Sequence, residues 1–236
     1  MPGFSGQKGD ALNNLAEIDG PRVAPASGGP ARQLVILLHG YGADGQDLIG
    51  LAPHFARVLP EAAFVAPDGP EACAGQPFGR QWWGIESFGR QERFLGTLAA
   101  APVLGAFIDA ELAQHNLDES RLVLVGFSQG TMMALHVGPR RQRRLAGIVG
   151  YSGALVAPER LAGEARSTPP VLLVHGDRDE LVPAESTLEA AEALAGAGIE
   201  VAWHFSPGQG HTIAPDGLRL GTEFLTRTLG GDGQVP

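Results

Sequence analysis

Cysteine is nearly absent from this chain: Cys73 is the only one among 236 residues, so no disulfide can form within one molecule. Such sparing use of cysteine is typical of proteins in reducing compartments, and we expect a cytoplasmic protein. Residues 1 to 30 contain no apolar segment of the kind found in secretory signals. No apolar run approaches the length of a membrane span, so we expect no stable membrane insertion.

Positive charge is also scarce. Lysine and arginine together number 17 against 26 aspartates and glutamates, which gives a formal net charge of −9. This balance argues against nucleic acid as a partner, and it gives no electrostatic reason to bind anionic membranes. No group of cysteine, histidine and acidic residues has the spacing of a metal site, so we expect neither a metal nor another cofactor.

The residues that are abundant indicate an ordinary globular protein. Hydrophobic residues make up 44% of the chain and charged residues 18%, which is not the composition of a disordered protein. Apolar runs typical of buried strands alternate with stretches of helical periodicity. Strands are predicted at 22–26 (an edge strand), 32–38, 63–66, 122–125, 145–151, 171–175 and 199–206, and helices at 48–59 in part, 98–115, 131–137 (ended by Gly138-Pro139), 185–197 and 217–229.

This alternation predicts a single α/β domain over residues 1–236, with one open, mostly parallel sheet and helices on both of its faces. We expect residues 1–20 to be loosely ordered and residues 230–236 to form a tail. Residues 68–89 are predicted to be a long irregular loop, and such loops would have to supply any lid. In sheets of this kind, ligands bind beyond the carboxyl ends of the strands.

The sequence Gly126-Phe127-Ser128-Gln129-Gly130 lies between a predicted strand and a predicted helix. A strand, a Gly-x-Ser-x-Gly turn and a helix are the context of a nucleophile elbow, in which a tight turn holds a serine hydroxyl out at the edge of a sheet. Glycine makes up 34 of the 236 residues, so the five-residue pattern alone carries little weight and its flanks carry more. With those flanks, the pattern predicts Ser128 as a catalytic nucleophile.

A serine nucleophile needs a base, usually a histidine that is oriented by a carboxylate, and here both are expected later in the chain. His211 lies in a glycine-flanked loop directly after a late strand, and it is the predicted base. Five other histidines fall on predicted helices or strands and are expected to be structural: His54, His115, His136, His175 and His204. Two aspartates follow the strand at 171–175. Because an aspartate next to a glycine often only closes a turn, which suits Asp177, we favour Asp179 as the acid.

The oxyanion formed on attack needs two preorganised N–H donors. One is expected to be the backbone N–H of Gln129, the residue after the nucleophile. The other is expected from the loop after an earlier strand, and the backbone N–H of Tyr41 has that place; a plain glycine-rich turn is the alternative. Losing such a donor costs roughly a hundredfold to a thousandfold in turnover, and Gln129→Ala should cost less because its backbone N–H remains.

Four stretches and a Gly-His pair make the chain resemble the phospholipase/carboxylesterase family of α/β-hydrolases, which includes acyl-protein thioesterases. They are Leu-Leu-His-Gly-Tyr-Gly-Ala-Asp-Gly (37–45), Pro-Phe-Gly-Arg-Gln-Trp-Trp (77–83), Gly-Phe-Ser-Gln-Gly-Thr-Met-Met-Ala-Leu (126–135), His-Gly-Asp-Arg-Asp-Glu-Leu-Val-Pro (175–183) and Gly-His (210–211). The resemblance implies an α/β-hydrolase fold with a minimal lid, hydrolysis of short to medium acyl esters or thioesters without a metal, and dimers in some members. It also implies that Asp179, the second aspartate of His-Gly-Asp-x-Asp, is the triad acid. The bacterial carboxylesterase branch looks nearer than the thioesterase branch, because of the segments Tyr-Gly-Ala-Asp-Gly and Arg-Gln-Trp-Trp.

Several apolar side chains near the predicted strand ends are candidates for lining an acyl pocket, and packing onto the domain explains them equally well. They are Trp82, Trp83, Ile85, Phe88, Leu181 and Val182. The arginine-rich run at 140–144 is expected to be a solvated face at a helix end.

Together these observations predict a serine carboxylesterase with a triad of Ser128, His211 and Asp179, acting on a small-molecule acyl ester. An acyl-protein thioesterase or a lysophospholipase is the first alternative. A non-catalytic protein of the same fold that binds a small apolar ligand is the second. An acyltransferase, in which an alcohol outcompetes water, is the third. A homodimer is expected from the resemblance alone.

Overall fold

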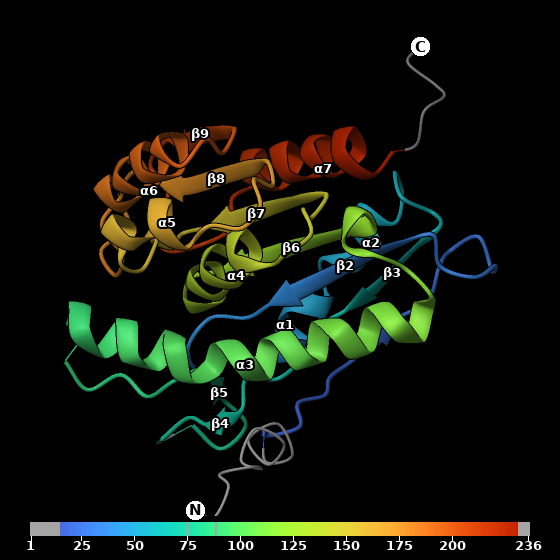
Figure 1. Cartoon of the computed structure of the whole chain (residues 1–236), viewed down its shortest axis with the longest axis horizontal. Helices are drawn as coiled ribbons and strands as arrows, with labels where there is room; N and C mark the ends of the chain where they lie inside the picture. The colour runs from blue at the N-terminus through green and yellow to red at the C-terminus, as the bar shows by residue number, and fades with distance from the viewer. Residues whose placement is uncertain (1–14, 75, 88, 231–236) are drawn as a thin grey trace, which may run out of the picture.

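The computed structural model describes residues 15–74, 76–87 and 89–230 (Figure 1). The expectations for the first 14 residues, for residues 231–236 and for Phe88 therefore lie outside the described residues. Residues 15–20 have no regular secondary structure.

Seven strands form the central sheet in the order β1–β3–β2–β6–β7–β8–β9. All neighbouring pairs are parallel except β1 and β3, which are antiparallel at one edge. The mostly parallel sheet predicted from the apolar runs is thus confirmed. The strands are β1 (Arg22–Val23), β2 (Gln33–Leu38), β3 (Ala62–Val65), β6 (Leu122–Phe127), β7 (Gly147–Tyr151), β8 (Val171–Gly176) and β9 (Val201–Ser206).

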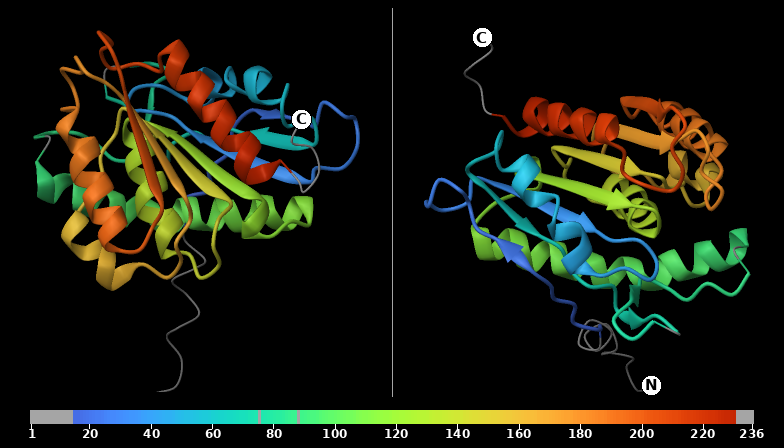
Figure 2. Two further views of the ribbon diagram at one scale, coloured as in Figure 1. Left: turned by 90° about the horizontal axis from the view of Figure 1, so that it is seen from above. Right: turned by 180° about the vertical axis from the view of Figure 1, so that it is seen from behind.

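Helices cover both faces of this sheet, as Figures 1 and 2 show. One face carries α3 (Arg90–His115), α4 (Gln129–Arg140), α5 (Pro158–Glu164) and α6 (Glu185–Gly196), and the other carries α1 (Gly45–Ile49), α2 (Ala52–Phe55) and α7 (Pro215–Leu229). A 3₁₀ turn, Glu119–Arg121, precedes β6.

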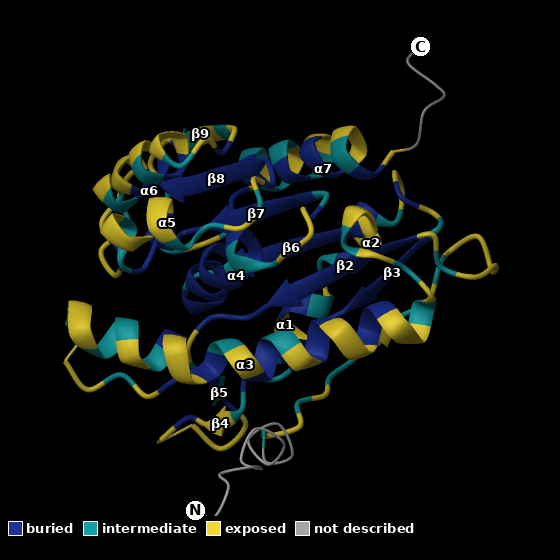
Figure 3. Ribbon diagram, viewed as in Figure 1, coloured by how far each residue is buried: buried dark blue, intermediate teal, exposed yellow. Residues whose placement is uncertain are grey.

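Two hydrophobic cores result from the alternation of side chains along the strands. In β2, Leu34, Ile36 and Leu38 belong to the core under α3 and α4, whereas Val35 and Leu37 belong to the core under α7. All six residues of β2 are buried, and Figure 3 shows the sheet buried between helices with exposed outer sides. Burial on both faces explains why the strand sequences are continuous apolar runs.

The helix boundaries differ from the predictions in three places. Helix α3 begins at Arg90, eight residues before the predicted start, so Pro102 lies inside the helix instead of near its first turn. Helix α4 continues through Gly138 and Pro139 to Arg140, where its predicted end was Val137. Helix α5 was not predicted. The carbonyl of Pro139 accepts N–H groups from residues 166 and 167, so tertiary contacts hold a helix end that local sequence disfavours.

The predicted irregular loop at 68–89 contains a small two-stranded sheet of β4 (Glu71–Ala72) and β5 (Arg80–Gln81). This pairing brings the following tryptophans, Trp82 and Trp83, down onto the main domain, where both are buried.

Helix α3 is, by length and composition alone, long and apolar enough to cross a membrane, contrary to the expectation from sequence. In this fold one side of the helix packs over the sheet, with Leu104, Phe107 and Ile108 in the core. This is how the core helix of an α/β domain is arranged.

Candidate active site

Ser128 stands in a strained turn between β6 and α4, with φ of 53° and ψ of −115°. This combination lies outside the left-handed helical region, and backbone conformations that are so sparsely populated cluster at functional sites. The flanking glycines are required by space: a Cβ at Gly126 would press on the backbone of Gly130, and a Cβ at Gly130 would overlap the carbonyl oxygen of Leu38. The Ser128 N–H donates to the Tyr151 carbonyl at 2.9 Å, which fixes the turn to β7.

His211 and Asp179 lie in the loops after β9 and β8 and are joined by a hydrogen bond. His211 Nδ1 is 2.7 Å from Asp179 Oδ2. Because a carboxylate can only accept, Nδ1 carries the proton and Nε2 of His211 is left as the basic nitrogen. Asp179 Oδ1 accepts the backbone N–H groups of Leu181 and Val182, each at 2.9 Å.

The Asp179 side chain is completely buried. Burial alone would raise the pKa of its carboxyl group, but hydrogen bonds from the Val182 N–H, from His211 and from the Leu181 N–H outweigh burial and lower that pKa. Asp179 is therefore a buried, ionised carboxylate that orients an imidazole.

Ser128 and His211 line the same cavity, whose volume is about 470 Å³. A cavity of this size is in the range of small-molecule sites. Its walls also include Tyr41, Trp83 and Leu181, and further lining residues are Gly40, Ala43, Ile85, Glu92, Arg93, Phe127, Gln129, Met132, Val182 and Pro183. Leu181 is 67% exposed and so forms part of the rim.

Trp82 does not line this cavity. It is buried in the core beneath α3, and its indole N–H donates to the carbonyl of His39 at 3.0 Å. Of the six candidates for lining an acyl pocket, the structure places Trp83, Ile85, Leu181 and Val182 at the cavity and gives Trp82 a packing position, and Phe88 lies outside the described residues.

The loop after β2 approaches Ser128 closely. A Cβ at Gly40 would lie 3.2 Å from the Ser128 Cβ, so glycine lets the Gly40–Tyr41 backbone reach the serine. His39 braces this loop: its Nδ1 is 2.7 Å from the Gly40 carbonyl, and its Nε2 accepts the Gly69 N–H at 2.8 Å. Burial lowers the pKa of His39, in keeping with a neutral ring that both donates and accepts.

Gln129 is the first residue of α4, where a backbone N–H has no partner within the helix. Its side chain has a second role that sequence reasoning missed. The Oε1 atom accepts the backbone N–H of Trp82 at 2.8 Å, and Nε2 donates to the backbone carbonyl of Trp83 at 2.9 Å. The buried amide thus ties the start of α4 to the tryptophan segment.

His175 is the second residue whose position sequence reasoning missed. It was expected to be structural, yet its Nε2 lies 3.1 Å from Asp179 Oδ2. The available signal was the four-residue spacing in His-Gly-Asp-x-Asp. Asp177, by contrast, accepts the Gly208 N–H at 2.6 Å in an exposed turn.

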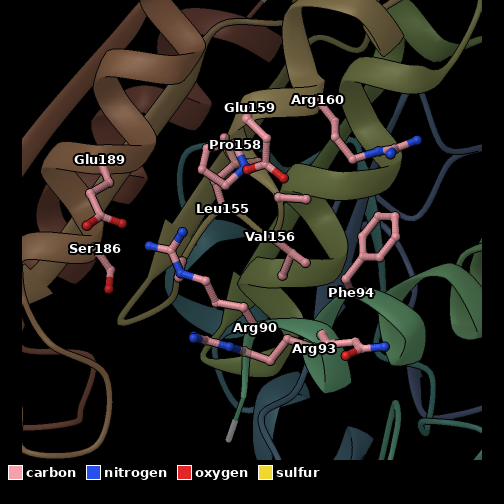
Figure 4. Close-up of a pocket in the computed structure, with 13 residues that line it drawn as sticks. Arg90, Arg93, Phe94, Leu155, Val156, Pro158, Glu159, Arg160, Ser186 and Glu189 are labelled. Carbon is pink, nitrogen blue, oxygen red and sulfur yellow. The ribbon is translucent and has the colours of Figure 1, made fainter.

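A second hollow, of about 350 Å³, lies beside α3 and is shown in Figure 4. Arg90 and Arg93 of α3 lie on the opposite side of the hollow from Glu159 of α5 and Glu189 of α6, and Arg160 points away from these two glutamates. Arg160 is paired with Glu164, and Arg93 also lines the Ser128 cavity. None of the predicted site residues lines this hollow. Within residues 15–74, 76–87 and 89–230, no group of three or more histidine, cysteine or acidic residues could hold a metal ion.

Comparison with known proteins identifies the family of this chain. The model of the phospholipase/carboxylesterase family matches residues 20–229. An acyl-protein thioesterase 1 from Gibberella zeae is 31% identical over 88% of this chain and 97% of its own, and esterase YpfH from Escherichia coli is 26% identical over 85% and 84%. The crystal structure of esterase PE8 superposes with a TM-score of 0.87, at 45% identity, over 90% of this chain and 100% of its own. The chain belongs to the phospholipase/carboxylesterase family and is an α/β-hydrolase that acts on ester bonds.

Proposed function

We propose that this protein is a serine carboxylesterase in which Ser128 is the nucleophile, His211 the base and Asp179 the acid that orients His211. The observation that carries the proposal is the His211–Asp179 hydrogen bond of 2.7 Å, together with the presence of Ser128 and His211 in the wall of one cavity. The strained backbone of Ser128 supports the same assignment, because strain of this kind persists where function requires it.

In the proposed reaction, Ser128 Oγ attacks the ester carbonyl carbon while His211 Nε2 takes the hydroxyl proton. The backbone N–H groups of Tyr41 and Gln129 bind the oxyanion that forms on the carbonyl oxygen. The C–O bond to the alcohol then breaks, and the alcohol leaves with the proton from His211. Water, deprotonated by His211, attacks the acyl-enzyme and releases the carboxylic acid with Ser128 restored.

The preference for carboxylic esters of short to medium acyl chains is supported by two observations. Identity is higher to esterase PE8, at 45%, than to the Gibberella zeae thioesterase, at 31%. The cavity, with Trp83, Met132 and Leu181 in its walls, offers apolar surface of limited volume. A thioesterase acting on acylated proteins is the second candidate, favoured by the name and the coverage of that relative.

A panel of p-nitrophenyl esters of increasing acyl length, assayed beside an acyl thioester, tests this proposal. We expect the highest kcat/KM for short to medium esters and lower values for the thioester. Ser128→Ala should lower turnover by many orders of magnitude, and a fluorophosphonate should label Ser128 in the wild type. Wild-type turnover in the Ser128→Ala variant would refute the nucleophile. A folded wild type that is neither active nor labelled would favour a non-catalytic binder.

Three further expectations belong to the proposal. Addition of short alcohols to the assay should leave the free acid as the main product, whereas an ester product would favour acyl transfer. A cytoplasmic location is supported by the single cysteine, which is buried and unpaired. The homodimer implied by the family resemblance can be tested by light scattering on the purified protein.

A further inference from the structure

His175 makes an unusual set of contacts for a histidine in the interior of a sheet. It lies near the end of β8 and is almost completely buried. Its Nδ1 is 2.8 Å from the hydroxyl of Thr187, a buried residue of α6. Its Nε2 is 3.0 Å from the Val182 carbonyl and 3.1 Å from Asp179 Oδ2. One imidazole therefore connects α6, β8 and the loop that carries Asp179.

These partners determine where the ring proton lies. The Val182 carbonyl can only accept, and so can the ionised Asp179 carboxylate, so Nε2 must carry the hydrogen. Nδ1 then accepts from the Thr187 hydroxyl, which can rotate to donate. Burial lowers the pKa of His175 and outweighs the Val182 carbonyl and the Asp179 carboxylate, which raise it, while the His211 imidazole lowers it further. The ring is neutral, and its single N–H donates to the Val182 carbonyl while the Asp179 carboxylate lies 3.1 Å from the same nitrogen.

Four N–H groups consequently surround the Asp179 carboxylate. Two backbone N–H groups donate to Oδ1 and His211 donates to Oδ2, while Nε2 of His175 lies 3.1 Å from Oδ2. The donors on Oδ1 come from Asp179's own loop, and His211 is the group that Asp179 has to position. Of these four groups, His175 alone lies on a strand of the sheet, β8. The same N–H also donates to the carbonyl of Val182, a residue that lines the Ser128 cavity.

We propose that His175 is a positioning residue, which fixes the Asp179 carboxylate through its Nε2–H so that Asp179 can hold His211 in line with Ser128. The inference rests on the proposed function, because it concerns the alignment of the proposed triad. His175 touches no reacting atom, and its effect passes through Asp179. Small misplacements of catalytic groups are costly, since an error of 1 Å can lower a rate by about a hundredfold.

Two amide substitutions separate this role from simple packing. The side chain of His175→Gln can place an N–H where Nε2 stands and so can still donate to Asp179. The side chain of His175→Asn reaches only the position of Nδ1, so it can bond Thr187 but not Asp179. His204→Leu is the matched control, because His204 lies on the neighbouring strand and bonds Asp216, at 2.8 Å, outside the site.

We expect His175→Asn to lower kcat by about tenfold to a hundredfold with little change in KM. His175→Gln should remain within a few-fold of wild type, and His204→Leu should match it. In protein with nitrogen-15-labelled histidine, the Nδ1–H signal of His211 should be sharp and strongly shifted downfield in wild type and His175→Gln. The same signal should be broadened or moved upfield in His175→Asn, and this readout does not depend on activity.

A folded His175→Asn variant with wild-type kcat and an unchanged His211 signal would overturn the inference. A folded His175→Gln variant with reduced kcat and a broadened or shifted His211 signal would also overturn it. If His175→Asn does not fold, His175→Gln alone tests the inference: kcat near wild type with a sharp His211 signal supports it, and loss of kcat and of that signal contradicts it. Failure of the proposed function is recognised separately: the wild type would then lack esterase activity and Ser128 labelling, whatever the His211 signal does in the variants.

Discussion

Two aspartates in one loop, Asp177 and Asp179, have opposite surroundings. Asp179 is fully buried and receives hydrogen bonds on both of its oxygens, one of them from His211. Asp177 is exposed and accepts one N–H, from Gly208, in the turn after β8. Their chemical identity is the same, so only the environment separates a candidate catalytic acid from a turn residue.

This contrast gives a prediction for the pair. Asp179→Asn should lower kcat by roughly a thousandfold to ten thousandfold, because an amide in this position stabilises the wrong tautomer of the histidine. Asp177→Asn, the matched control, should keep kcat near the wild-type value. Steady-state kinetics with a p-nitrophenyl ester measure both. The reverse ranking, with Asp177→Asn inactive and Asp179→Asn active, would contradict the assignment.

Gln129 shows how a side chain can matter beside a backbone donor. Gln129→Ala would remove the side chain that bonds the buried backbone N–H of Trp82 and the backbone carbonyl of Trp83. An unsatisfied buried group costs about 1–3 kcal/mol, so we expect the free energy of unfolding to fall by at least that amount. Urea unfolding measures the change, with Gln91→Ala, at an exposed position of α3, as the control. Equal stability of the two variants would argue against a stabilising role for the hydrogen bonds of the Gln129 side chain.

At the scale of elements, strands were easier to predict than helix ends. Every strand of the main sheet lies within or close to its predicted range. For the inner strands the reason is burial on both faces, which requires a continuous apolar run. The ends of α3 and α4 depend on contacts made elsewhere in the chain, and proline at positions 102 and 139 pointed the prediction the wrong way. Local sequence carries no record of those contacts.

Helix α4 contains a titratable group whose pKa is strongly shifted. Burial, followed by the charge of Arg140, lowers the pKa of His136 to about 4. An unfolded histidine has a pKa near 6.5, so between pH 6.5 and 4 the unfolded chain binds more protons than the folded one. Stability should therefore fall as pH falls through this window, by at most about 3 kcal/mol from this residue.

His136→Leu should flatten this dependence, because leucine has no proton to bind. We expect the difference in unfolding free energy between pH 7 and pH 4.5 to be smaller in His136→Leu than in the wild type. His54→Leu, at an exposed position of α2, should leave the difference unchanged. Identical pH dependence in wild type and His136→Leu would show that other groups control acid stability.

At the scale of the whole molecule, the arrangement of the candidate site followed from chain order. Ser128, Asp179 and His211 each come just after a strand of one parallel sheet, and such strand ends meet at one edge. The chain order of these three residues and the sheet edge at which they lie could be predicted from sequence. The role of the Gln129 side chain could not be predicted, since a side-chain amide that bonds backbone groups more than forty residues away leaves no local pattern. For His175, the four-residue spacing to Asp179 was the signal that the sequence did contain.

The two cores share their strands, because alternate residues of β2 and β6 face opposite sides. Loosening one face should therefore loosen the other, and we expect the chain to unfold in a single transition despite its length. Tryptophan fluorescence, which includes Trp82 and Trp83 beneath α3, and far-UV circular dichroism should give coincident urea curves. Curves that separate would indicate that the faces unfold independently.

Two glycine-to-alanine changes, one on each face, sharpen this test. Gly221 in α7 faces the buried Tyr151, and a Cβ there would overlap the Tyr151 hydroxyl, so Gly221→Ala should destabilise the fold by about 1–3 kcal/mol. Gly105 in α3 has open space around it, so Gly105→Ala should stabilise the fold by up to about 1 kcal/mol through helix propensity. Because the sheet couples the faces, both probes should report the same midpoint shift in each variant. If Gly221→Ala lost far-UV circular dichroism while the fluorescence of Trp82 and Trp83 persisted, the core beneath α3 would remain folded without α7.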